Sequence, residues 1–277
     1  MQPTPASQPE VLATILVAPP RNPFQLGRVI ARTFSAWWHH LPAFTALTLV
    51  ADLPILLASV LSSVPVPGVT APNRNPFDRA AMEAAPTMPQ GVWVAYGVTL
   101  FLFMVEVGAI THGVIHHLAG KRVSLAAMIG TGFRRFFPLL AVAVICYLMI
   151  VVGTVLLVVP GVFLFCAVAV AIPAVVVERP GVFGAIRRSF ALTKKNRLAI
   201  LAAFLVLVPV SFGVTALGGF LLPQLTSSIS PMIGTVIGLA VTLVFRTLLW
   251  IAPGVVYHDL REAKEGMQTA QLAAVFE

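Results

Sequence analysis

Three charged side chains interrupt long apolar stretches of this chain and are its first candidates for chemistry. They are Asp52, Glu106 and Arg246, and each lies near the middle of its stretch. A lone charge at the centre of a membrane costs at least about 2.5 to 3.5 kcal/mol, so we expect Arg246 to pair with Glu106 or Asp52. Such a group could bind a polar headgroup or take part in a proton-coupled step. We favour a structural ion pair, because no periodic polar face continues through the bilayer.

Histidines form a second candidate group at the end of one apolar stretch. His112, His116 and His117 lie there, and the spacing of four between His112 and His116 could present two imidazoles to a metal ion. A third ligand is missing from the neighbouring sequence, although His258 and Asp259 are expected at a similar depth. We therefore predict neither a metal nor another cofactor.

Motifs for catalysis are absent from the sequence. It contains no Gly-x-Ser-x-Gly, no His-Glu-x-x-His, no phosphate loop and no glycine fingerprint for a dinucleotide. The segments between the apolar stretches are too short to form a soluble catalytic domain. We expect no catalytic residues and a protein that is not an enzyme.

The elements that must hold these residues are membrane-spanning helices. Of 277 residues, 58% are hydrophobic and only 10% are charged, whereas a soluble domain has about 25% charged residues. Crossing a bilayer takes about 20 apolar residues in a helix. Six stretches qualify, so we predict an all-α polytopic membrane protein; they are 41–62, 92–118, 137–159, 162–177, 198–222 and 232–257.

The third and fourth stretches are separated only by Pro160 and Gly161, which predicts a tight hairpin with its turn at this pair. Cys146 and Cys166 lie 14 and 6 residues from that turn, so their depths would differ by about 12 Å. The Cα atoms of a disulfide must lie within about 7 Å of each other. We expect two free cysteines.

Basic residues predict the orientation of the spans. Fifteen of the 18 Lys and Arg residues share one side, whereas the other side has only Arg74 and Arg79, in a Pro-rich loop at 64–90. The positive-inside rule therefore places both termini in the cytoplasm. This distribution also accounts for the net charge of +8 without a nucleic-acid partner. We predict a disordered tail at 1–22, one membrane domain at 23–260 and a second tail at 261–277.

A short amphipathic segment precedes the first, third and fifth spans. Apolar residues recur there with a spacing of four: Leu26, Ile30, Phe34; Leu125, Ile129, Phe133; Val182, Ile186, Phe190. We expect each segment to lie as a helix in the membrane surface, with its basic side chains toward anionic headgroups. The basic residues of this surface are Arg28, Arg32, Arg134, Arg135, Arg187, Arg188, Lys194 and Lys195.

The ends of the even spans support an internal repeat. Residues 112–117, 173–178 and 253–258 align without gaps. We therefore predict three units, each a surface helix followed by two spans, at about 23–118, 122–178 and 180–260.

The segment 172–195 carries a longer pattern, in which an apolar span ends in Glu178 and is followed by Gly181, Ser189 and Leu192 before two lysines. It resembles the signature of the membrane domain found in some glycerophosphoryl diester phosphodiesterases and in stand-alone YciC-like membrane proteins. Ile186 stands where that family has Leu. A second similarity lies at 256–261, and the resemblance covers about 22–266. It implies a six-helix protein of the bacterial inner membrane, but no phosphodiesterase activity, since that chemistry resides in a separate soluble domain.

These observations favour a non-enzymatic inner-membrane protein that engages anionic lipids or a protein partner through its basic surface helices, with a role in envelope or membrane homeostasis. The alternative is a small transporter or channel for a lipid-like or amphiphilic solute, with Asp52, Glu106 and Arg246 at the midplane. An intramembrane lipid-modifying enzyme that uses the interfacial histidines is a third hypothesis.

Overall fold

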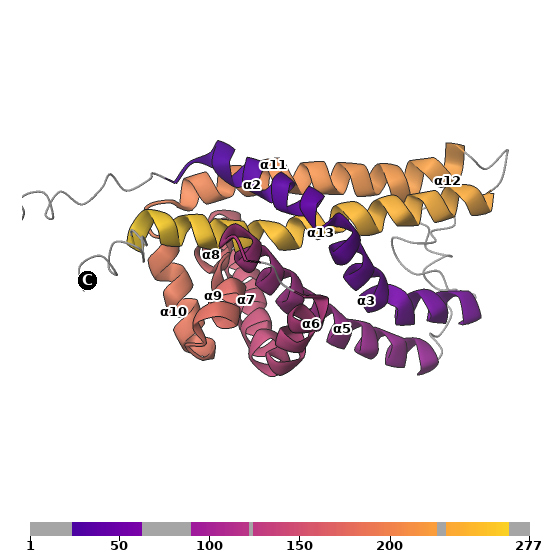
Figure 1. The fold of residues 1–277 in the computed structure, drawn as a ribbon, viewed down its shortest axis with the longest axis horizontal. Helices are drawn as coiled ribbons and strands as arrows, with labels where there is room; N and C mark the ends of the chain where they lie inside the picture. Colours follow the sequence, from indigo (N-terminus) through magenta and orange to yellow (C-terminus); the bar gives the residue numbers. More distant parts are fainter. Residues whose placement is uncertain (1–23, 63–89, 122–123, 226–230, 266–277) are drawn as a thin grey trace, which may run out of the picture.

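The computed structural model describes residues 24–62, 90–121, 124–225 and 231–265, and within them the chain is helical without a β-strand (Figure 1). Among these described residues, six helical stretches are long and apolar enough to cross a membrane. The predicted fold class is therefore confirmed. The predicted tail at 1–22 and nearly all of the predicted outer loop at 64–90 lie outside the described residues.

The candidate spans lie close to the predicted stretches. The first three are α3 (Leu41–Ser62), α5 (Gln90–Leu118) and α7 (Phe136–Leu156). The fourth combines α8 (Val158–Val168) with α9 (Ala171–Glu178). The fifth begins with α11 (Arg197–Ala216), which leads into a π-helical turn (Leu217–Leu221) and α12 (Leu222–Leu225), and the sixth lies in α13 (Pro231–Glu265).

The hairpin of the third and fourth spans is present, but its turn is not where the sequence predicts it. Leu157 has an extended backbone and separates α7 from α8, so Pro160 lies inside the first turn of α8. Proline is tolerated there because the first N–H groups of a helix have no intrahelical partner. Gly161 permits close packing, because a Cβ at this position would lie 2.8 Å from the Cα of Thr154. Cys146 and Cys166 are free, as predicted.

The fourth span is broken between α8 and α9, whereas the sequence predicts one continuous helix. Pro173 lies in the first turn of α9 and has no N–H to donate to the carbonyl of Ala169 four residues earlier. The helix is interrupted at Ala169 and Val170 and begins again at Ala171. The break leaves backbone groups that need other partners.

The long helix α13 lies at the centre of the molecule. It packs against α2 (Leu26–His39), α3, α5, α9, α10 (Val182–Thr193) and α11, and it runs along the length of the molecule in Figure 1. Leu248, Ile251 and Val255 on it are fully buried. The helix continues to Glu265, so the folded part of the chain extends past the predicted boundary at 260.

The three predicted surface segments are helical: α2, α6 (Leu125–Arg134) and α10. Each packs on an even span, α2 on α13, α6 on α5, and α10 on α8 and α9. The residues most deeply buried by this packing include Thr33, Gly132 and Ser189, each directly before the last apolar residue of its segment. The position of these helices in a membrane surface and the threefold repeat stay predictions.

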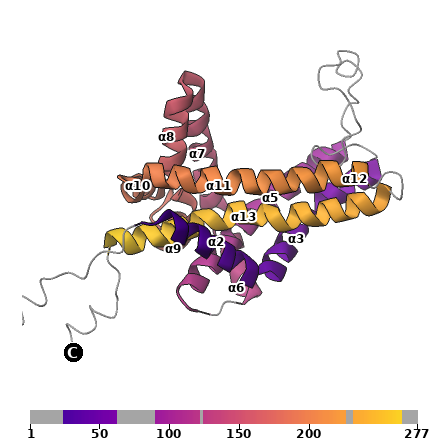
Figure 2. The same cartoon turned by 90° about the horizontal axis from the view of Figure 1, so that it is seen from above.

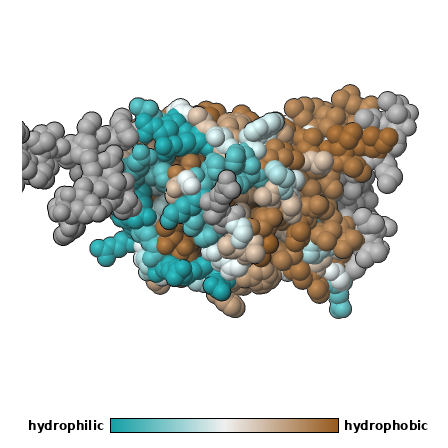
Figure 3. Space-filling model, in the orientation of Figure 1, coloured by the Kyte–Doolittle hydropathy of each residue, from teal (hydrophilic) through white to brown (hydrophobic). Residues whose placement is uncertain are grey.

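The face of the molecule shown in Figure 3 is divided into two regions. Hydrophilic residues gather over the start of α2, α10 and the C-terminal end of α13, whereas hydrophobic residues cover the opposite end around α12 (Figure 3). The α7–α8 hairpin projects away from the α11–α13 pair (Figure 2), and its outer part exposes large apolar side chains such as Val155 and Val159. Such a surface needs contact with lipid or with another apolar surface.

Candidate functional site

The three charged residues predicted in the spans meet inside the molecule. Arg246 of α13 lies 2.8 Å from Asp52 of α3 and 3.7 Å from Glu106 of α5, measured between guanidinium nitrogens and carboxylate oxygens. The Glu106 side chain is only 1% exposed. The structure therefore has the predicted pairing, with both acids around the one arginine.

Thr48 is a fourth member of this cluster that sequence reasoning missed. Its hydroxyl donates a 2.5 Å hydrogen bond to Glu106, and Thr48 is fully buried. The signal was present in the sequence, because Thr48 precedes Asp52 by four residues and so shares its face of the helix. The cluster joins three spans, and this arrangement fits an ion pair that fixes helix packing.

The histidines do not form the group that the sequence suggests. The rings of His112 and His116 lie 4.0 Å apart, but His117 faces a different pair, His39 and His40, at the junction of α2 and α3. The Nδ1 atom of His117 and the Nε2 atom of His40 are 3.1 Å apart. Burial, with the neighbouring His117 and His39, lowers the pKa of His40, so the ring is uncharged at neutral pH.

His258 and Asp259 lie with Glu262 rather than with the other histidines. One possible ligand atom from each lies within 4.8 Å of the others, a spacing that a metal ion could bridge. However, Arg32 of α2 already contacts both acids, Glu262 at 3.1 Å and Asp259 through a direct ion pair. A cation already occupies the place where the metal would neutralise charge, so we propose no metal here.

Two arginines predicted to face lipid are instead turned toward acids of the protein. Arg32 pairs with Asp259 and Glu262. Burial lowers the pKa of the Arg32 guanidinium, but the hydrogen bonds to these two acids together outweigh that effect and raise the pKa above its ordinary value. Arg32 therefore attaches α2 to the end of α13.

Arg188 does the same for α10. It lies 2.8 Å from Glu178 of α9 and also pairs with Glu265 of α13, while the Tyr257 hydroxyl donates a 2.6 Å hydrogen bond to Glu178. Arg188 and Arg32 occupy the same place in their segments, two residues before Phe190 and Phe34. We call these two sets of ion pairs the arginine contacts of the surface helices.

The four residues of the signature pattern lie at the junction of the fourth span with α10. Glu178 binds Arg188, and Leu192 is buried in the core. Gly181 has a φ of 76°, a left-handed conformation that favours glycine. The Ser189 hydroxyl donates to the carbonyl of Ala167 at 2.7 Å and accepts from the N–H of Val170 at 3.3 Å. Ser189 thus binds backbone groups that the break in the span leaves free.

The remaining basic residues of the predicted surface have different surroundings. Arg28 donates to the side chain of Gln25, and Arg135 is half-buried. Arg134, Arg187, Lys194 and Lys195 are exposed, and none has a carboxylate partner within ion-pair distance among the described residues. These four are free to meet an external anion.

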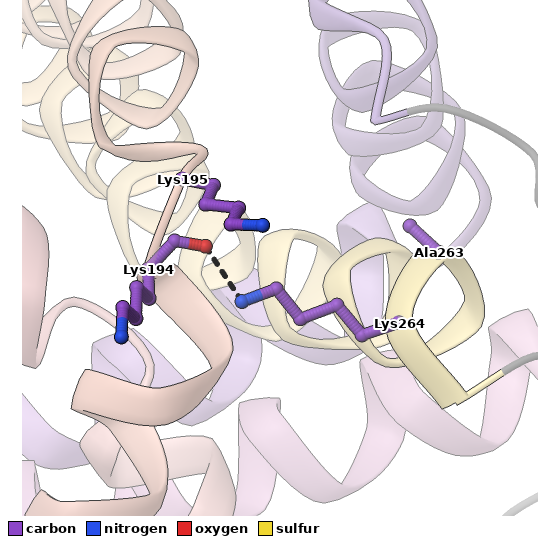
Figure 4. A pocket seen from close by; sticks show the side chains of 4 residues that line it. All are labelled: Lys194, Lys195, Ala263 and Lys264. Carbon is purple, nitrogen blue, oxygen red and sulfur yellow. Dashed lines mark hydrogen bonds between the residues drawn. The ribbon is translucent and has the colours of Figure 1, made fainter.

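A pocket of about 360 Å³ lies between the end of α10 and the end of α13, lined by Lys194, Lys195, Ala263 and Lys264 (Figure 4). The ammonium of Lys264 donates to the carbonyls of Ala191 and Lys194, at 2.7 and 2.6 Å. Sequence reasoning used Lys264 only to predict orientation. Its place beside Lys194 and Lys195 could not be found from the sequence, because 69 residues separate it from Lys195.

No family model matches the chain, and no solved structure matches it. A UPF0259 membrane protein of Photorhabdus laumondii subsp. laumondii is 30% identical over 131 residues, which are 47% of this chain and 50% of that protein. The chain thus matches about half the length of this curated relative. Together with the six apolar helices, the similarity supports a multi-pass bacterial membrane protein.

Proposed function

We propose that this protein is a non-enzymatic component of the bacterial inner membrane that binds anionic lipids through its basic surface helices. The observation that carries the proposal is the group of exposed cations without an acidic partner among the described residues, Arg134, Arg187, Lys194 and Lys195. Large apolar side chains are exposed close to them in sequence, such as Phe133 and Phe183. Cations beside exposed apolar groups are typical of the interface between lipid headgroups and acyl chains.

The proposal includes both termini in the cytoplasm, where anionic lipids attract basic segments at about 1 kcal/mol per residue. It also includes the relationship to the membrane domain of the phosphodiesterase family, which rests on Glu178, Gly181, Ser189 and Leu192. Each of these four residues has a structural role at the junction of the fourth span with α10. A role in envelope or membrane homeostasis agrees with a protein that gathers anionic lipids.

The test is native mass spectrometry of the detergent-purified protein, scoring co-purified lipids. A variant with Arg134→Gln, Arg187→Gln, Lys194→Gln and Lys195→Gln is expected to lose most of its bound phosphatidylglycerol. The control carries Arg74→Gln and Arg79→Gln, on the predicted opposite side of the membrane, and is expected to keep it. Equal anionic lipid in the fourfold variant and the wild type would refute the proposal and direct the search to a protein partner.

A second candidate function, transport of a lipid-like or amphiphilic solute, is favoured by the buried cluster of Asp52, Glu106 and Arg246. Such a cluster at mid-depth is often part of a solute or proton path. Under this hypothesis Arg246→Met abolishes uptake by proteoliposomes that contain a normally folded protein. Uptake that persists in the folded variant would exclude this function.

A further inference from the structure

The pocket lined by Lys194, Lys195, Ala263 and Lys264 lies where the loop before α11 meets the end of α13. We propose that this pocket binds the phosphate group of one anionic phospholipid. The inference rests on the proposed function and deepens it, since it replaces a diffuse basic surface with one defined headgroup site.

The charge around the pocket favours an anionic ligand. Three lysines line it, and Arg197 is close enough for its charge to act on Lys264. No described carboxylate lies within ion-pair distance of these lysines, and the nearby Glu265 is held by Arg188 and Arg261. Like charges gathered without a counter-ion repel one another, so a bound anion would relieve this repulsion.

The ammonium groups of Lys264 and Lys195 are already arranged for a ligand. Two backbone carbonyls hold the Lys264 ammonium in place, and one of its three N–H donors remains for an anion. The backbone of Lys195 has a φ of 77°, which is uncommon for a residue with a side chain. In Figure 4 the Lys195 ammonium lies on the same side as that of Lys264, whereas the Lys194 side chain points away.

The expected depth of the pocket in a bilayer also favours a lipid phosphate as the ligand. Arg197, two residues after Lys195, begins both α11 and the fifth candidate span, and Leu198 is 82% exposed. The pocket therefore lies where an apolar helix leaves the hydrocarbon, which is the level of lipid phosphates. The first turn of α11 has no side-chain cap, so its N–H groups add positive potential there.

A simpler interpretation is that Lys264 only caps the C-terminal end of α10. That role explains its two hydrogen bonds to carbonyls, but it does not explain why Lys195 faces the same space. The two interpretations differ in what a change at Lys195 does to lipid binding, and this difference decides the experiment.

The experiment measures binding of phosphatidic acid, phosphatidylglycerol and phosphatidylcholine to the full-length protein by native mass spectrometry. We expect one tightly bound phosphatidic acid in the wild type. Loss of one charge-assisted hydrogen bond should weaken its binding about tenfold in Lys195→Gln and in Lys264→Gln. The control Lys121→Gln removes an exposed charge elsewhere and should change the affinity less than about twofold. Wild-type affinity in folded Lys195→Gln would overturn the proposal even if Lys264→Gln fails to fold.

Inorganic phosphate is added as a competitor to identify the source of the ligand. Displacement of phosphatidic acid by inorganic phosphate at low concentration would assign the site to a soluble phosphate and overturn its assignment to a lipid. Resistance to this competitor supports a lipid ligand. Equal affinity for phosphatidylcholine and phosphatidic acid would overturn the proposal. If Arg134→Gln with Arg187→Gln reduces anionic lipid but Lys195→Gln does not, the pocket is wrong and the proposed function stands. If the wild type binds no anionic lipid, both fail.

Discussion

Single residues differ in what their type reveals about their partners. Asp52, Glu106 and Arg246 are predicted to meet because an unpaired charge in a membrane is too unfavourable, and they do meet. Arg32 and Arg188 are not restricted in this way, because at a membrane surface a guanidinium can form hydrogen bonds with water, with lipid or with protein. Only the fold places acids of α13 and α9 beside them.

The buried cluster gives a prediction about stability. Replacement of Arg246 by methionine leaves two carboxylates, Asp52 and Glu106, without their cation. Removing one partner of a buried ion pair typically costs about 3 to 5 kcal/mol. We expect Arg246→Met to lower the thermal unfolding temperature in detergent markedly, and far more than Arg187→Met, which removes an exposed arginine.

A compensating variant tests the cause of that loss. Arg246→Met combined with Asp52→Asn and Glu106→Gln removes the uncompensated charge while keeping side-chain volume. Most of the lost stability should return. If the triple variant is as unstable as Arg246→Met, the instability comes from packing and our electrostatic explanation is wrong.

At the scale of elements, each surface helix has a small residue packed against its span, and of these three residues only Ser189 is part of a pattern recognised in the sequence. The apolar pattern in the sequence comprises Leu26, Ile30 and Phe34 and their equivalents, which are the partly exposed side of each helix. The residue before each phenylalanine, Thr33, Gly132 or Ser189, is among the buried residues that face the protein. At Gly132 a Cβ would collide with the carbonyl of Val105. The size of the side chain at this position decides how closely the surface helix approaches its span.

Ser189 allows this attachment to be tested. Replacement by alanine removes the hydroxyl that binds the carbonyl of Ala167 and the N–H of Val170 at the break in the fourth span. The carbonyl of Ala167 keeps the Thr193 hydroxyl as a donor at 3.3 Å, but the N–H of Val170 loses its side-chain acceptor. Leaving such a buried group unsatisfied costs about 1 to 3 kcal/mol. We expect Ser189→Ala to lower the unfolding temperature and to speed amide hydrogen exchange around residues 167–171. Ser35→Ala, at an exposed site on α2, should do neither; equal behaviour of the two variants would contradict the role of Ser189.

In the whole molecule, α13 connects groups of residues that lie far apart in the sequence. Its middle holds the buried charge cluster, and its C-terminal end holds the arginine contacts of the surface helices and one wall of the lysine pocket. The polar and apolar halves of the surface divide along the same direction (Figure 3). The helix α13 therefore connects the buried charge cluster inside the membrane domain with the basic face of that domain.

The orientation of α13 relative to the two sides of the membrane is also a prediction. In a background of Cys146→Ala and Cys166→Ala, a cysteine at Ala71 should react with a membrane-impermeant maleimide in intact spheroplasts. A cysteine at Ser7 should react only after the membrane is permeabilised, since the positive-inside rule places it in the cytoplasm. Reversed labelling would overturn the predicted topology and with it the cytoplasmic lipid-binding face.

Hydrophobicity alone determined that the chain forms six apolar helices, because the membrane requires a run of about 20 apolar residues whatever the helix later packs against. The same reasoning predicted the charges that must be paired. Hydrophobicity did not predict the turn at Leu157 or the break before Pro173, because both depend on where a proline falls within a helical turn.

The tertiary structure alone decided which charges are satisfied within the protein and which remain for a ligand. Lys264 and Lys195, or Arg188 and Glu265, are distant in sequence and come together only because α10 packs beside the end of α13. Composition and periodicity report what a segment does in a solvent, water or lipid. They do not indicate that the end of α10 meets the end of α13, and the candidate lipid site lies where these two helices meet.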